Sequence, residues 1–331
     1  MISSFMDNMY FNVLEDFMNA DSNVLLLPLY FFGLYMILEA ADWGLCLAAP
    51  LVSRNREENR AILGLLKPGL DGNELWYFLG MIMMGAAIPG IADGPTGGSR
   101  TVLILLVALG AVLRLAAAFM RNTFSHSAVM KGMSLFSLLA LVTMGLLSAF
   151  LLTPEKSVFS FSGILCALWM VLASFQLGTL YGAVKIVNPL GERFRAAFLV
   201  SGVLTVAVYI ILVVLLKNIA GDSLMYGSFF WISLVATALL FIAAFFFTRM
   251  RHVNAGLVAV YVSSFFAITI YLSAYAAVLP TLFPVNVNDL KQVMDEMPGM
   301  ALLTASFVWT LASFLWRQMR KKENYEWKDH I

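Results

Sequence analysis

Two acidic side chains lie three residues apart inside an otherwise apolar segment. Glu39 and Asp42 belong to the stretch LYMILEAADWGLCLAAP, and on a helix this spacing puts both side chains on one face. A carboxylate at membrane depth is costly and usually faces the interior of a helix bundle. The pair could therefore relay protons or bind a cation. The alternative is a structural role, in which both acids are protonated and hydrogen-bond a neighbouring helix.

A third acid follows in the segment KPGLDGNELW, directly before the next apolar run. Asp71 could take part in proton transfer. However, Asp before Gly-Asn is also typical of a turn or a helix N-cap, with Glu74 three residues later as in a capping box. The spacing alone leaves both interpretations open. Trp76 and Tyr77 come next, and aromatic residues at the start of a span are usually interfacial anchors.

Basic and amide side chains inside the apolar segments are candidate partners for these acids. Arg114 could pair with a carboxylate such as Asp71, or it could extend its side chain to the lipid headgroups. Lys185 has the same two interpretations, and headgroup contact is favoured because it ends its apolar segment. Gln176 lies deep in that same segment, so we expect it to hydrogen-bond a neighbouring helix.

The composition indicates what kind of protein positions these groups. Of the 331 residues, 61% are hydrophobic and 12% are charged, whereas soluble domains carry roughly 25% charged residues. The chain is therefore a polytopic membrane protein. Its net charge of +1 does not suggest binding to nucleic acid. Its three histidines and two cysteines have no metal-ligand or haem-attachment spacing, so we expect this chain to bind neither a metal nor a haem.

The elements that position the acids are predicted to be transmembrane helices. A spanning helix needs about 20 apolar residues, and nine segments qualify. They are 24–51, 74–92, 101–120, 128–152, 159–186, 196–219, 227–248, 256–280 and 300–318. Lys and Arg gather in every second loop and in the C-terminal tail, and basic loops stay cytoplasmic. The pattern predicts an all-α membrane fold with the N-terminus outside and the C-terminus cytoplasmic.

The two ends of the chain differ from this transmembrane domain, which we place at 24–320. Residues 1–23 carry apolar side chains at helical spacing with acidic residues between them. They are predicted to form an amphipathic helix on the membrane surface, and a frayed polar terminus is the alternative. Residues 321–331 form a basic cytoplasmic tail. The loops between the spans are short, so any chemistry is expected within the membrane or at its faces.

Several of these motifs together resemble subunit II of the cytochrome bd quinol oxidases. ILEAADWGL matches the family's acid-x-x-Asp-x-Gly pattern in the first span, and KPGLDGNELW resembles its P-x-W-D-G-N-x-V-W block. Further matching positions are Arg114, Arg121, Gly178, Tyr181, Lys185, Arg193 and Arg195. The resemblance covers residues 40 to 200 best. Ala40-Ala41 replaces the family's Gly-Phe and Leu70 replaces its Trp, which indicates a divergent member.

The resemblance implies a fold of two four-helix bundles plus one peripheral helix. It also implies a haem-free subunit II that stabilises its partner and takes up protons from the cytoplasm. Asp71 would be the proton-uptake carboxylate, and Glu39 and Asp42 would be inner carboxylates of the path. Other matched side chains would support this path: Asn73, Trp76, Arg114 and Lys185.

The partner that the resemblance implies is subunit I. In this family, subunit I binds two b-type haems and one haem d, oxidises quinol and reduces dioxygen to water. Small single-helix subunits, membrane lipid and quinol are the other expected partners, in the cytoplasmic membrane of a bacterium. In some members a structural quinone or lipid also sits in subunit II.

Two other functions remain open at this point. A proton-coupled transporter could use Glu39 and Asp42 as its cation site and would work without a partner. Such transporters often have helices broken at mid-membrane, whereas Pro28, Pro89 and Pro280 lie near the ends of the predicted spans. A pure assembly scaffold with no proton role is the other alternative, and it would tolerate replacement of Asp71 by Asn.

Overall fold

The computed structural model describes residues 25–66, 73–88, 97–119, 124–153, 157–186, 189–221, 228–286 and 308. The helices within these ranges are α3 (Leu26–Val52), α4 (Arg56–Leu65), α5 (Asn73–Ala87), α6 (Gly97–Phe119), α7 (His126–Leu152), α8 (Phe161–Lys185), α9 (Pro189–Ala220), α10 (Ser228–Arg249) and α11 (Val253–Leu282). The described ranges contain no strand, which confirms the all-α prediction.

Eight of these helices correspond to predicted spans. Six of them, α3 and α7 to α11, are long and apolar enough to cross a membrane. The predicted span 300–318, the amphipathic segment 1–23 and the tail 321–331 lie outside the described residues. The orientation in the membrane and the division into two bundles stay predictions.

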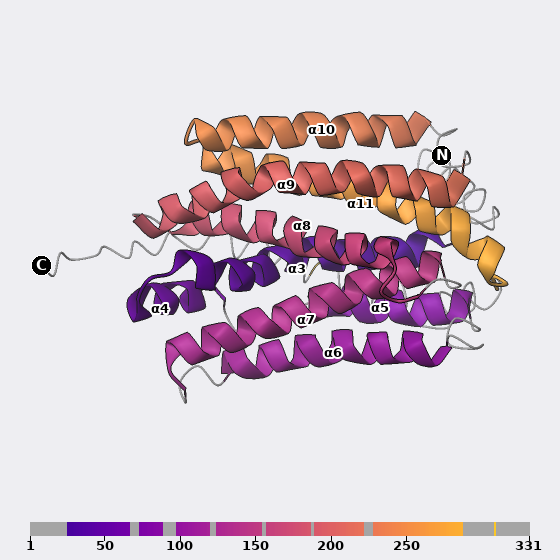
Figure 1. Cartoon of the computed structure of the whole chain (residues 1–331), viewed down its shortest axis with the longest axis horizontal. Helices are drawn as coiled ribbons and strands as arrows, with labels where there is room; N and C mark the ends of the chain where they lie inside the picture. The colour runs from indigo at the N-terminus through magenta and orange to yellow at the C-terminus, as the bar shows by residue number, and fades with distance from the viewer. Residues whose placement is uncertain are drawn as a thin grey trace, which may run out of the picture.

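Helices α3 and α8 lie at the centre of the molecule (Figure 1). Helix α3 packs mainly on α5, α7, α8 and α11, while α6 packs on α7 and α10 packs on α11. In Figure 1, α6 and α10 consequently form opposite edges of the molecule. Because α3 is enclosed, its polar side chains are buried among helices rather than exposed to lipid.

Two glycines allow the central helices to touch. A Cβ atom on Gly44 of α3 would lie 1.7 Å from the carbonyl oxygen of Ser174, and one on Gly178 of α8 would lie 2.1 Å from the carbonyl carbon of Gly44. Backbone atoms cannot yield as a flexible side chain can, so any larger residue would push the helices apart. Such small-residue contacts are the usual way in which membrane helices approach closely. Glu39 and Asp42 lie on α3 just before this crossing.

Helix α4 corrects the prediction that the stretch between the first two spans is a charged loop. The Asn55 side chain caps it by accepting from the Glu58 amide at 2.9 Å. Its apolar side chains Ala61, Ile62 and Leu63 are buried, and Ile62 and Leu63 belong to the core cluster that contains Cys46 of α3. Helix α4 therefore covers the end of the bundle at which α3 ends.

An arginine on α9 fixes this short helix in place. Arg193 forms an ion pair with Glu58, and its second terminal nitrogen donates to the Val52 carbonyl at 2.5 Å. The other carboxylate oxygen of Glu58 accepts from the backbone amide of Arg54 at 2.5 Å. These contacts join the end of α3 and the start of α4 to α9.

Candidate functional site

A buried ion pair lies at the centre of the candidate site. Nη2 of Arg114 on α6 donates to Oε2 of Glu39 on α3 at 2.8 Å. Glu39 is 2% exposed and Arg114 is 7% exposed. The suggestion that Arg114 extends to the headgroups is therefore wrong, because its charge stays inside the bundle. The alternative partner Asp71 lies outside the described residues.

The Trp43 ring also contacts the Arg114 guanidinium. The guanidinium carbon of Arg114 lies 5.6 Å from the centre of the Trp43 ring, and a cation over an indole face is stabilised by the ring quadrupole. Nε of Arg114 is buried without a hydrogen-bond partner. The ion pair and the ring hold the guanidinium, while its Nε remains an unsatisfied donor within the site.

Asp42 lies on the same side of α3 as this pair. It is 9% exposed, and Arg114 interacts electrostatically with Glu39, Asp42, Cys46 and Tyr35. Two carboxyl groups therefore share the field of one guanidinium in a medium of low dielectric constant. Such a cluster can hold a proton or a cation at a depth where water cannot solvate it. We name Glu39, Asp42 and Arg114 the acid–arginine cluster.

Two further side chains of the site were missed in the sequence. Trp43 and Cys46 follow Glu39 at four and seven residues, which is the spacing of one helix face. The Cys46 thiol is fully buried beside Arg114 and Ser137 of α7. The signal was present, but apolar residues at helical spacing are usual in any packed helix. Within the part of the chain that the structure describes, no group of three or more His, Cys, Asp or Glu side chains could hold a metal ion.

The structure corrects the interpretation of Trp76 and places its neighbour. Trp76 is 3% exposed and its ring lies 5.4 Å from that of Phe31 on α3, so it is a core residue and not an interfacial anchor. Tyr77 is half-buried, and its ring lies 5.1 Å from the ring of Tyr35. Asn73 begins α5, but its side chain and Asp71 lie outside the described residues.

Gln176 and Lys185, the two polar residues of α8 for which the sequence predicted a role, have different environments. Nε2 of Gln176 donates to Ser201 on α9 at 2.5 Å and to the Phe198 carbonyl at 3.4 Å, which confirms the predicted interhelical hydrogen bond. Lys185 is half-buried in the last turn of α8, with its ammonium nitrogen 5.8 Å from the centre of the Tyr181 ring. Arg121 lies outside the described residues.

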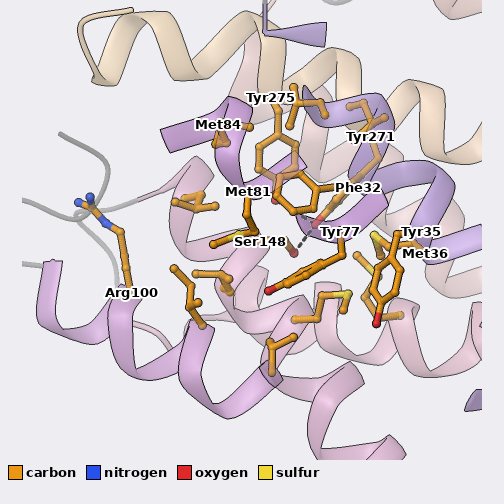
Figure 2. A pocket seen from close by; sticks show the side chains of 18 of the residues that line it. Phe32, Tyr35, Met36, Tyr77, Met81, Met84, Arg100, Ser148, Tyr271 and Tyr275 are labelled. Carbon is orange, nitrogen blue, oxygen red and sulfur yellow. Dashed lines mark hydrogen bonds between the residues drawn. The ribbon is translucent and has the colours of Figure 1, made fainter. Parts of the chain in front are cut away.

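An apolar cavity of ≈190 Å³ lies between α3, α5, α6, α7 and α11. Figure 2 shows Phe32, Met81 and Met84 among its lining residues. Dashed lines in the figure mark the hydrogen bonds from Tyr275 to Tyr271 at 3.2 Å and from Tyr271 to Ser148 at 2.5 Å. Small-molecule sites usually measure about 300–1,000 Å³. This cavity is smaller than that range.

A larger cavity of ≈420 Å³ lies between α3 and helices α8 to α11. Its lining includes Gln176 and Tyr209. Oε1 of Gln176 is buried without a hydrogen-bond partner, and the buried hydroxyl of Tyr209 lies beside Thr237. The amide oxygen can only accept, while the hydroxyl can donate or accept. Its volume and polar atoms fit an apolar molecule that carries a hydroxyl group.

Comparison with known proteins identifies the family. The family model for cytochrome bd terminal oxidase subunit II matches residues 22–316, a range that includes the whole acid–arginine cluster. The chain belongs to this family. A subunit II protein is part of a bd-type oxidase, so this chain is a membrane component of an oxidoreductase complex whose haem-bearing partner is subunit I.

A solved structure supports the same fold. A chain of the bd oxidase from Geobacillus thermodenitrificans matches this subunit II protein with a TM-score of 0.68 and 16% sequence identity. The match covers 91% of this chain and 97% of that one. At this identity the likeness shows the fold alone. No curated protein sequence matches the chain.

Proposed function

We propose that this chain is the haem-free subunit II of a bd-type quinol oxidase and that it conducts protons towards the site of dioxygen reduction. The observation that carries the proposal is the buried acid–arginine cluster, located at the motif shared with the family. A membrane protein keeps ionisable groups at this depth at a considerable cost in free energy, which is usually offset by a role in ion or proton transfer.

Asp71 and the three members of the acid–arginine cluster each have a distinct part in the proposal. Asp71 takes up the proton at the cytoplasmic face, and Asp42 and Glu39 pass it through the bundle. Arg114 keeps the Glu39 carboxylate in a defined position through their 2.8 Å contact. A guanidinium remains charged at any pH of interest, so it can stabilise the carboxylate left after a proton has moved on without becoming a proton carrier itself.

The exposed apolar faces of the outer helices support a stabilising role towards subunit I. Apolar side chains are exposed along α6, α9 and α10, for example Leu105, Val203 and Leu239. Lipid or a partner chain must cover them. We propose that one of these faces packs on subunit I, which holds the two b-type haems and haem d. We also assign a structural quinone or lipid, where one is present, to the ≈420 Å³ cavity near Gln176 and Tyr209.

The experiment is to measure quinol-dependent oxygen consumption of the purified complex. Asp42→Asn and Asp71→Asn keep the side-chain shape but remove the exchangeable proton, so each should slow turnover by at least 10-fold while the haem spectrum stays unchanged. Asp222→Asn is the control, because Asp222 falls between the predicted spans 196–219 and 227–248 and should leave turnover unchanged. Wild-type rates in both variants, with normal haem content, would contradict the proton role and indicate that the chain is only an assembly scaffold.

A further inference from the structure

A polar cavity of ≈500 Å³ opens where α3 ends and where α4 and α7 begin. Its lining side chains include Arg54, Arg56, Asn59, Ser127 and Lys131. We call the space that these five residues line the basic cavity. Figure 1 shows α4 at the same end of the molecule as the start of α7. The charge pattern of the loops predicts that this end faces the cytoplasm.

The charges around the basic cavity favour an anion. Three of its lining side chains are cationic, and no acidic side chain lines it among the described residues. The nearby carboxylate of Glu58 is occupied by Arg193 and by the Arg54 amide. The capping residues of α4 and α7, Asn55 and Ser125, also line the cavity. The positive ends of two helix dipoles therefore add to the field of the side chains.

Two exposed apolar residues are sequence neighbours of residues that line the basic cavity. Leu51, at the end of α3, is 75% exposed, and Phe124, just before α7, is 57% exposed. Pro50 lines the cavity itself and is also exposed. A soluble anion would make no use of these apolar surfaces. An amphiphile with an anionic head and hydrocarbon chains would cover both the cations and these apolar side chains.

We propose that the basic cavity binds the phosphate-bearing headgroup of an anionic phospholipid. The phosphate lies among Arg54, Arg56 and Lys131, the hydroxyl and amide groups of Ser127 and Asn59 contact the glycerol oxygens, and the acyl chains run along Leu51. Basic clusters beside transmembrane helices on the cytoplasmic side commonly recognise such lipids. Bound lipid would hold the start of α4 against α7. The site is separate from the acid–arginine cluster, so it does not depend on the proposed proton path.

The test is a lipid titration of the intact purified complex, followed by native mass spectrometry. Each basic residue near an anionic leaflet strengthens binding about fivefold, so R54Q/R56Q/K131Q should bind phosphatidylglycerol on the order of 100-fold more weakly than wild type. R249Q/R251Q is the control, because Arg249, the last residue of α10, and Arg251, in the α10–α11 connection, are exposed cations that do not line the cavity. The control should bind like wild type.

Two further measurements keep the result decisive. If the triple variant fails to assemble, K131Q alone should weaken binding about fivefold. Phosphatidylcholine and inorganic phosphate are titrated in parallel, and neither should compete well with phosphatidylglycerol. Equal binding by the triple variant and the control would overturn the site. Competition by inorganic phosphate as strong as by the lipid would overturn the assignment to a phospholipid.

Discussion

The ion pair between Glu39 and Arg114 makes a quantitative prediction about stability. Both groups are buried, and their charged atoms lie 2.8 Å apart. Removing one member of a buried pair leaves the other charge uncompensated and typically costs about 3–5 kcal/mol. We therefore expect Glu39→Gln to lower the free energy of unfolding by about this amount, because a guanidinium cannot escape its charge by losing a proton.

The two single variants should not be equally severe. In Arg114→Gln the remaining Glu39 can take up a proton and become neutral, so we expect a smaller loss, towards about 3 kcal/mol. In the double variant Glu39→Gln/Arg114→Gln both side chains of the pair are neutral amides, which can form a hydrogen bond of about 1 kcal/mol with each other. It should be more stable than either single variant.

The assay is unfolding of the purified complex by titration with sodium dodecyl sulfate, followed by circular dichroism. Lys217→Gln is the control, because Lys217 is exposed in the last turn of α9 and should change stability by less than about 0.5 kcal/mol. The reasoning fails if the losses of the two single variants simply add in the double variant, since additive effects mean that the two side chains do not interact.

Two other contacts lead to further predictions. Gly44→Ala should lower the free energy of unfolding by about 3 kcal/mol, because the new Cβ meets the Ser174 backbone at 1.7 Å. Gly85→Ala is the control, because a Cβ at Gly85 meets open space, and it should be neutral or slightly stabilising. Thermal melts of the two variants measure both effects. Arg193→Gln should speed amide hydrogen exchange in α4 by roughly 10-fold or more, because Glu58 loses a charged partner. Unchanged exchange in α4, or equal melting temperatures for the two glycine variants, would contradict these assignments.

The spans could be predicted well because their physical signal is strong. Long apolar runs between short loops have few alternatives to membrane helices, and the polar residues within them stand out for the same reason. Glu39, Asp42 and Arg114 were therefore visible as candidates. The interhelical role of Gln176 followed from its depth alone, because an amide in hydrocarbon needs a partner.

The pairing of these groups could not be predicted. Arg114 is 75 residues away from Glu39, and their contact depends on how α3 and α6 are placed by α7. Helix α4 was missed because it is short and charged, although Asn55 followed three residues later by Glu58 is a helix-start signal. Trp76 was assigned to the interface because its place in the chain suggested it, whereas its burial depends on packing against α3.

The most direct test of the central claim is a reduced-minus-oxidised optical spectrum of the complex purified through a tag on this chain from its native membrane. The account predicts a haem d band in the far red, b-type haem bands and a second large subunit in the preparation. A colourless, well-folded and monomeric preparation would contradict it, and proton flux with Glu39 and Asp42 variants would then test a transporter instead.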